Sequence, residues 1–210
     1  MLTVDPAENI QLLATNNMLP ALISVADSGH FDRLMDWPVL LQGGPDHTCS
    51  LITQVVSVFY LPLANEIDSN LLDLLQQIMI KAEIVQKLLG SFKYLHQDFL
   101  ELPMSLLYRL VLNEKGFSKQ FVEMGGLDPK LANSLLRDTN PNGVIADMLL
   151  IISQLARSSK TYYENIHSAS LYGSWLKLLA HQDANIRAKT CNLIGNLCKY
   201  SAYFYAELKK

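Results

Sequence analysis

Residues 175–208 read WLKLLAHQDANIRAKTCNLIGNLCKYSAYFYAEL, and their pattern is the strongest indication of the fold. Residues 132–166 read ANSLLRDTNPNGVIADMLLIISQLARSSKTYYENI, and the two stretches align at a constant offset of 42 residues. The matched apolar and aromatic pairs are Leu136 with Leu178, Val144 with Ile186, Ile152 with Ile194, Leu155 with Leu197, Tyr162 with Phe204, Tyr163 with Tyr205, and Ile166 with Leu208. An offset of 45 residues extends the match one unit earlier and pairs Leu110 with Leu155, Phe117 with Tyr162, and Phe121 with Ile166. The chain therefore contains an internal repeat.

A repeat of this length indicates a helical solenoid. Two or three helices within a period of about 40–47 residues are typical of armadillo and HEAT repeats. One such unit cannot bury its apolar face alone, so neighbouring units stack around a shared core. The composition agrees, because helix-breaking residues are few: 10 glycines and 8 prolines among 210 residues. We predict an all-α chain, an armadillo/HEAT-like right-handed α-solenoid of about four repeats with an irregular N-terminal unit.

The repeat pattern also predicts how the chain is organised. We expect residues 1–210 to form a single armadillo-like helical domain. Its N-terminal part, 1–103, fits the period poorly, whereas residues 104–210 repeat clearly. Terminal repeats are often atypical because they close the shared core against water. The predicted elements outside the clear repeats are one helix within 2–27, an irregular connection over 35–46, a helix over 48–63 that Pro62 ends or kinks, a helix or helix pair over 69–89, and an aromatic segment over 92–102.

Two residues of the last repeat carry local predictions. Asp183 precedes an apolar helical pattern and is placed to cap the helix that follows. Gly195 lies inside that helix, where glycine costs about 1 kcal/mol relative to alanine. A close crossing with a neighbouring helix would explain this glycine.

Composition and charge exclude several classes of protein. Apolar residues make up 50% of the chain, which excludes intrinsic disorder. The formal net charge is −3 and the isoelectric point is about 5.9, so a basic nucleic-acid footprint is absent. The longest uncharged run, 47–65, contains Pro62 and several polar residues, and we expect a buried helix there, not a membrane span.

The cysteines indicate the compartment. Cys191 and Cys198 stand seven positions apart on an expected helix, about 10 Å from each other, which is too far for a disulfide. Three unpaired cysteines, with Cys49 as the third, favour a reducing compartment. We therefore expect the chain to be cytoplasmic.

No motif for catalysis, a cofactor or a metal is present in the sequence. The glycine pairs lack the spacing of phosphate-binding loops, and no serine sits in a nucleophile elbow. His96 and Asp98 resemble part of a kinase catalytic loop, but Pro103 stands where that loop needs a metal-binding Asn. The five histidines have no helical partner among histidines or cysteines. We expect no catalytic residue, no cofactor and no metal in this chain.

Polar residues on the last helix of each repeat are the candidate partner-binding residues. A solenoid lines its concave face with these helices. The candidates are Asn192, Asn196 and Lys199 on the last repeat, and the positions equivalent to Asn196 in the two preceding repeats, Gln154 and Arg109. An asparagine amide offers two donors and an acceptor to a peptide backbone. The alternative is that Asn196 ties neighbouring repeats together, and the aromatic residues near Tyr205 are likewise either inter-repeat core or an exposed anchor.

One stretch of the sequence resembles a known family. Its most specific part is IRAKTCNLIGNLC at 186–198, followed by YFY at 203–205 and preceded by NPNGVIADMLLIISQLARSSKTYYENI at 140–166. Together these segments are similar to the C-terminal armadillo-type region of the Fused family of serine/threonine kinases. The resemblance covers about 126–208. It implies that the parent protein carries an N-terminal kinase domain, and that this helical region is regulatory.

The resemblance also implies partners and a setting. It implies a role in Hedgehog signalling, or in cilium or microtubule assembly. The implied partners are a Costal2-type kinesin and a Suppressor-of-Fused-type protein. We expect a non-catalytic scaffold region that binds proteins, not nucleic acid or membrane. The alternatives are docking onto its own kinase domain to inhibit it, an oligomerisation segment, and an armadillo adaptor of an unrelated trafficking protein.

Overall fold

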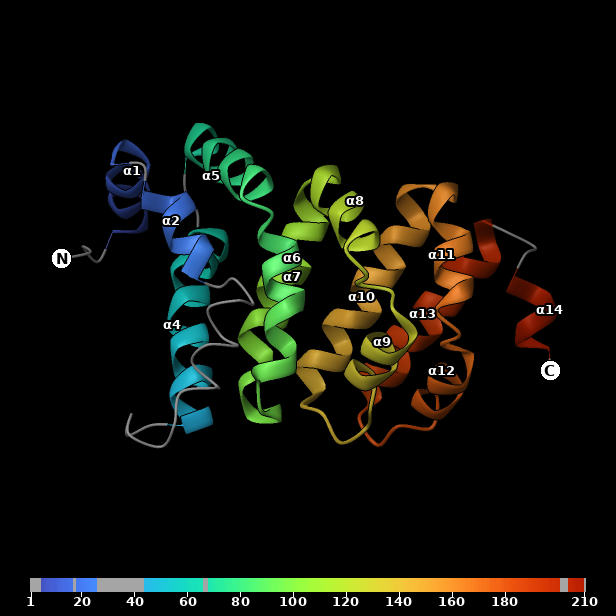
Figure 1. Ribbon diagram of the computed structural model, residues 1–210. Helices are drawn as coiled ribbons and strands as arrows, with labels where there is room; N and C mark the ends of the chain where they lie inside the picture. The colour runs from blue at the N-terminus through green and yellow to red at the C-terminus, as the bar shows by residue number, and fades with distance from the viewer. Residues whose placement is uncertain (1–4, 17, 26–43, 66–67, 201–203, 210) are drawn as a thin grey trace. The chain divides into compact units, whose positions relative to one another are not determined.

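The regular structure of the protein is helical. The structure is a computed structural model that describes residues 5–16, 18–25, 44–65, 68–200 and 204–209, and none of these residues lies in a strand. The chain divides into two compact units, Met1–Leu110 and Val111–Lys210. Figure 1 labels most of the helices of both units. The prediction of a single domain over 1–210 stays a prediction.

The first unit is built from helices of unequal length. They are α1 (Pro6–Thr15), α2 (Met18–Val25), α4 (Gly44–Ala64), α5 (Ser69–Lys81), α6 (Ile84–Ser91), the short 3₁₀ helices η1 (Phe92–Tyr94) and η2 (Gln97–Phe99), and the beginning of α7 (Glu101–Asn113). Helix α1 contacts α2, α4 and α5, and α2 also contacts α4, α5 and α6. The shared core of this unit includes Ile10, Leu19, Ile23, Ile52, Phe59 and Met79, each at most 2% exposed.

The single helix predicted within 2–27 is wrong, because the chain forms α1 and α2 instead. A continuous helix would need the backbone nitrogen of Pro20 to donate to the carbonyl of Asn16, and proline has no such hydrogen. The break is further stabilised because Asn16 Nδ2 donates to the Leu12 carbonyl over 2.8 Å, which satisfies an acceptor at the end of α1.

The irregular connection predicted over 35–46 is corrected in its last three residues. Helix α4 already begins at Gly44, and proline is tolerated in the first turn of a helix, as at Pro45. Residues 35–43 lie outside the described ranges. Pro62 lies within α4, which ends two residues later at Ala64, as the sequence predicts.

The segment 69–89 forms a helix pair. Helices α5 and α6 are separated by Ala82 and Glu83, and Glu83 adopts a left-handed backbone conformation with φ of 54°. Asp68 caps α5, because its Oδ1 accepts hydrogen bonds from the backbone nitrogens of Asn70 at 2.9 Å and Leu71 at 3.4 Å.

The second unit repeats one helix order. Two short helices precede a long one in each repeat. The helices are α8 (Lys115–Glu123), α9 (Pro129–Leu135), α10 (Asn142–Ser158), the 3₁₀ helix η3 (Lys160–Tyr162), α11 (Tyr163–Ser168), α12 (Tyr172–Leu178), α13 (Ala184–Tyr200) and α14 (Tyr205–Leu208). The long helices α10 and α13 begin 42 residues apart, at Asn142 and Ala184, which confirms the predicted period.

Three of the matched pairs are buried in both repeats. Leu155 and Leu197 are both 0% exposed. The pairs Leu136 with Leu178 and Val144 with Ile186 are also buried, at 3% exposure or less. The aromatic residues divide between core and surface: Tyr163 packs edge-on against buried Phe204 with ring centroids 5.5 Å apart, whereas Tyr205 is 49% exposed.

Gly195 is not explained by a close helix crossing. A Cβ atom built at this position meets nothing within 4 Å, so the sequence-based prediction for this glycine is wrong. Gly126 differs, since a Cβ there would overlap the ring of Phe121. The preceding Gly125 has φ of +84°, a conformation that glycine adopts at no steric cost. These two glycines therefore make the turn between α8 and α9.

The cysteines and the apolar helices are the other subjects of the sequence predictions. The three cysteines are free thiols, with Cys49 buried and Cys191 exposed, and burial raises the pKa of the Cys198 thiol. Within the described ranges, no helix combines the length and the apolar character that crossing a membrane requires.

Candidate functional site

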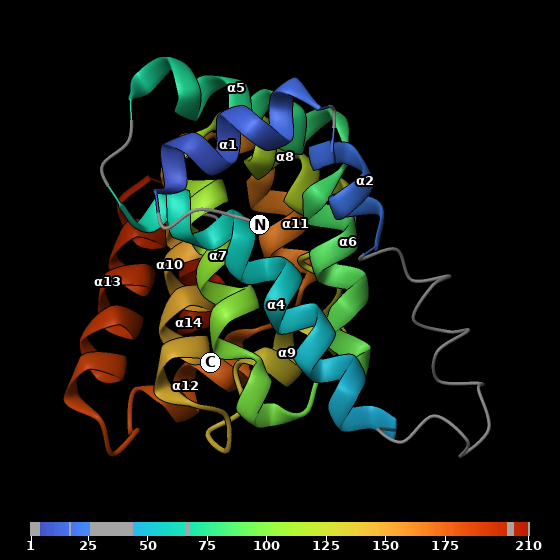
Figure 2. The ribbon, with the colours of Figure 1, turned by 90° about the vertical axis from the view of Figure 1, so that its left-hand side faces the viewer.

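The two long helices of the second unit form a continuous face. Helices α10 and α13 contact each other along their length and lie side by side in Figure 2. Leu155 of α10 and Leu197 of α13 are fully buried. The polar side chains beside this seam include three of the predicted partner-binding residues, Asn192, Asn196 and Gln154.

Asn196 connects the two repeats. Its Nδ2 donates to Ser153 Oγ on α10 at 2.7 Å and to Asn192 Oδ1 on its own helix at 2.8 Å. Because Ser153 is buried, its hydroxyl has little access to water, and this hydrogen bond gives the hydroxyl a partner within the protein. The inter-repeat role that the sequence left open for Asn196 is therefore present in the structure. Its predicted role in partner binding stays a prediction.

A hollow of about 230 Å³ lies over the α10–α13 seam, and we call it the seam hollow. Its lining residues are Leu150, Ser153 and Arg157 of α10 and Ala188, Lys189 and Asn192 of α13. Predicted Gln154 does not line this hollow, but its Oε1 accepts a hydrogen bond from Arg157 Nη2 at 2.8 Å. The seam hollow therefore presents two cationic side chains and the amide of Asn192 beside small or apolar residues.

The other two predicted residues lie elsewhere. Lys199 is exposed in the last turn of α13 and does not line the seam hollow. Arg109 belongs to the first unit, where its Nη1 donates to the Leu63 carbonyl at 2.9 Å and its guanidinium lies 5.1 Å from the ring centroid of Tyr60. Within that unit, Arg109 ties α7 to the end of α4.

Sequence reasoning missed Ser153, Arg157 and Lys189. The 42-residue period contained a signal for one of them, because Arg157 stands 42 residues before the predicted Lys199. Ser153 stands 43 residues before its hydrogen-bond partner Asn196, one position off the apolar alignment. The alignment uses only the buried apolar positions, so it does not show which polar residues of neighbouring repeats meet at a separation of 43 residues.

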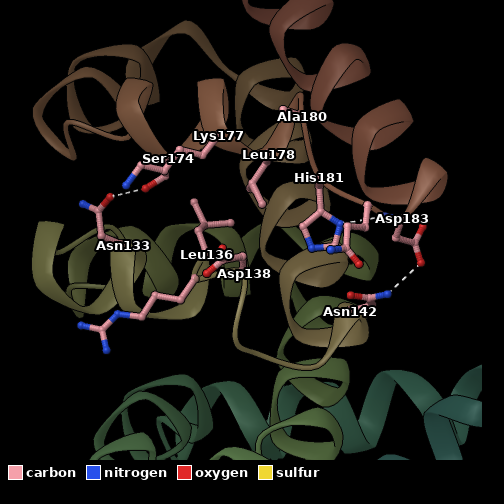
Figure 3. Close-up of a pocket in the computed structure, with 12 residues that line it drawn as sticks. Asn133, Leu136, Asp138, Asn142, Ser174, Lys177, Leu178, Ala180, His181 and Asp183 are labelled. Atoms are coloured by element: carbon pink, nitrogen blue, oxygen red, sulfur yellow. Dashed lines mark hydrogen bonds between the residues drawn. The ribbon is translucent and has the colours of Figure 1, made fainter.

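A second hollow, of about 740 Å³, lies at the loop edge of the same unit, and we call it the loop-edge hollow (Figure 3). Two hydrogen bonds join its walls: Ser174 Oγ donates to Asn133 Oδ1 at 2.7 Å, and Asn142 Nδ2 donates to Asp183 Oδ2 at 2.7 Å. Leu136 and Leu178 lie between these two pairs in Figure 3. The sequence analysis did not predict this hollow.

Asp183 connects the loop-edge hollow to the start of α13. Its Oδ1 accepts from the backbone nitrogens of Asn185 at 2.7 Å and Ile186 at 3.3 Å, which confirms the predicted cap. These backbone hydrogen bonds, followed by that from Asn142 and the nearby His181, hold the pKa of the Asp183 carboxyl below its ordinary value of 3.8. Arg187 Nη1 donates to the carbonyls of His181 and Gln182 at 2.8 Å each and so fixes the loop.

The charges of the two hollows differ. The loop-edge hollow contains Arg137 and Lys177 together with Asp138 and Asp183, so its cationic and anionic groups balance. The seam hollow contains Arg157 and Lys189 and no carboxylate. Among the described residues, no group of three or more His, Cys, Asp or Glu side chains is arranged to hold a metal ion.

Comparison with known proteins finds kinases among the similar sequences. The chain is 36% identical over 126 residues to serine/threonine-protein kinase TIO of Arabidopsis thaliana, a match that covers 60% of this chain and 10% of that protein. It is 28% identical over 163 residues to serine/threonine-protein kinase 36 of Pongo abelii, which covers 72% of this chain and 12% of that protein. The chain thus spans about a tenth of the length of these curated relatives. No protein-family model matches it.

Solved structures establish the fold. A designed armadillo repeat protein in complex with the peptide (KR)4 superposes with a TM-score of 0.70 at 15% identity, covering 96% of this chain and 73% of that one. Computationally designed armadillo repeat proteins for modular peptide recognition give a TM-score of 0.70 at 16% identity, with 96% and 74% covered. The chain therefore has the armadillo-type α-solenoid fold. Together with the similarity to part of a serine/threonine kinase, this supports a non-catalytic repeat region.

Proposed function

We propose that the chain is the partner-binding regulatory region of a Fused-type serine/threonine kinase. The observation that carries the proposal is the 36% identity to serine/threonine-protein kinase TIO over 126 residues. The match covers 10% of the length of that kinase, and we assign the kinase reaction to another part of the parent protein. The role of this region is to hold other proteins in place.

The seam hollow is the surface that we assign to this role. Asn192 and Ala188 are exposed there, on helix α13, whose Leu193 and Leu197 are buried in the core. Sites on rigid helices position their side chains better than sites on loops do. Designed proteins of the same fold recognise peptides, which adds support at the level of fold alone.

The proposed partners follow from the family resemblance. They are a Costal2-type kinesin and a Suppressor-of-Fused-type protein, in Hedgehog signalling or in assembly of cilia or microtubule arrays. We propose that the chain is cytoplasmic and is associated with cilia or microtubule arrays. Binding to each partner is a separate proposal, and a separate binding measurement tests it.

The test is direct binding between purified proteins by calorimetry. The folded chain is titrated with each partner, and then A188W is titrated in the same way, because a tryptophan there would fill the seam hollow. The matched control is A184W, which places the same side chain at another exposed alanine of α13 that does not line the hollow. We expect at least one partner to bind, A188W to abolish that binding and A184W to retain it.

Two results would change the conclusion. A folded chain that binds neither partner contradicts the partner assignment. Inhibition of an isolated Fused-type kinase domain by the added chain would instead identify that domain as the partner.

A further inference from the structure

The seam hollow carries a charge opposite to that of the chain as a whole. The chain has a formal net charge of −3, whereas the hollow is lined by Arg157 and Lys189 and by no carboxylate. We infer that the seam hollow binds an acidic segment of a partner protein in an extended conformation. This inference rests on the proposed function and names the chemistry of the segment that the same surface recognises.

Both cationic groups are available to a ligand. Arg157 is exposed, and one of its terminal nitrogens, Nη2, is engaged with Gln154 Oε1. This hydrogen bond orients the guanidinium and leaves further donors for a carboxylate. Lys189 is half-buried and forms no ion pair with any residue that the structure describes. A carboxylate in the hollow would therefore meet two cations that no described acid neutralises.

Asn192 supplies the contact to the peptide backbone. Its Oδ1 accepts from Asn196 Nδ2, so the orientation of the amide is set and its own Nδ2 can donate to a ligand. No described residue accepts a hydrogen bond from Asn192 Nδ2. A main-chain carbonyl of an extended peptide is an acceptor of the right type. Backbone recognition by Asn192 and charge recognition by Arg157 and Lys189 then act on the same segment.

A peptide fits the seam hollow better than another polyanion does. Proteins that bind single-stranded nucleic acid stack its bases on aromatic side chains, and no aromatic residue lines this hollow. The loop-edge hollow is a poorer site for an acidic segment, because Asp138 and Asp183 oppose its two cations. It serves instead as the internal control.

The experiment measures fluorescence anisotropy of labelled octapeptides with the folded chain. The probes are (DE)4, (KR)4 and the neutral (QS)4, at low and at physiological salt. We expect (DE)4 to bind, with an affinity that falls as salt rises, and (KR)4 and (QS)4 to bind at least tenfold more weakly, or about 1.4 kcal/mol. Equal binding of all three peptides, or tighter binding of (KR)4, would overturn the inference.

Matched double variants locate the site. R157Q/K189Q removes both cations of the seam hollow, and R137Q/K177Q removes the same charge from the loop-edge hollow of the same unit. We expect R157Q/K189Q to weaken (DE)4 binding about tenfold and R137Q/K177Q to change it less than about twofold. Circular dichroism verifies folding, and R157Q alone, at an exposed position, serves if the double variant unfolds. Equal loss in both double variants would show a general charge effect and contradict the site.

Two further readouts separate this inference from the proposed function. A partner protein that binds the chain and is unaffected by R157Q/K189Q overturns the inference while the proposed function stands. Binding of (DE)4 through Arg157 and Lys189, without binding of either partner, overturns the partner assignment and supports the inference. A single-stranded oligonucleotide that displaces (DE)4 at equal concentration would overturn the assignment to a peptide.

Discussion

Asn196 of α13 donates a 2.7 Å hydrogen bond to Ser153 of α10, 43 residues earlier in the chain. The two residues are therefore one repeat apart in sequence and in contact in space. Asn133 and Ser174, and Asn142 and Asp183, form hydrogen bonds at a separation of 41 residues. The repeat thus aligns polar side chains as well as the apolar core, and neighbouring repeats are fixed in register by side-chain hydrogen bonds.

The first prediction concerns the Asn196–Ser153 hydrogen bond. N196A leaves the buried Ser153 hydroxyl without this partner, and we expect it to lower the free energy of unfolding by about 0.5–1.5 kcal/mol. The measurement is urea denaturation of N196A, S153A and the double variant. A coupling energy of about 0.5 kcal/mol or more between the two sites would demonstrate a direct interaction. Strict additivity would contradict it.

The second prediction concerns the shared core. Leu155 and Leu197 are equivalent and fully buried, and we expect L155A and L197A each to lower the free energy of unfolding by about 2–5 kcal/mol. Leu176, which is 55% exposed, gives the control, and L176A should change stability by less than about 0.5 kcal/mol. Chemical denaturation followed by circular dichroism measures all three. Loss in only one of the two buried variants would contradict equivalent packing.

The repeat itself could be predicted from the sequence, for a physical reason. Stacked units must bury the same stripe, so Leu155 and Leu197 recur at a fixed offset that the sequence displays directly. The Asp183 cap could also be predicted, because a cap depends on residues close in sequence. The N-terminal break was missed although its signal was present, since Pro20 removes a donor that a continuous helix would need.

The seam hollow could not be predicted in the same way. Which surface residues surround a hollow depends on how two helices are rotated and shifted, and an alignment of buried positions does not contain that information. Ser153 and Lys189 were therefore missed although they lie near the predicted Gln154 and Asn192. Arg109 was assigned to the candidate face by its period, yet one of its terminal nitrogens donates to the Leu63 carbonyl within the first unit.

The third prediction contrasts two glycines. Gly195 lies in α13 with open space at its Cβ position, so G195A should raise the free energy of unfolding by about 0.5–1 kcal/mol through helix propensity. G126A should lower it, because its Cβ would overlap Phe121 in the turn before α9. Thermal denaturation of both variants checks the signs. A destabilised G195A would show that the helix contacts something at that position.

The fourth prediction concerns the pH dependence of stability at Asp183. Backbone hydrogen bonds at the start of α13 lower the pKa of this carboxyl below 3.8 in the folded protein. A carboxyl with a lowered folded pKa contributes stability above its unfolded pKa and loses that contribution as pH falls through the folded value. In D183N the side chain can still cap the helix but carries no charge and cannot titrate.

We therefore expect the urea midpoint of the wild type to exceed that of D183N at pH 6, and the difference to shrink below about pH 4. The control is D138N, which removes the charge of an exposed carboxyl that makes no hydrogen bond with a described residue, and the urea midpoint of this variant should stay close to that of the wild type at pH 6. A gap between wild type and D183N that stays constant from pH 6 to pH 3 would show that the charge of Asp183 does not stabilise the start of α13.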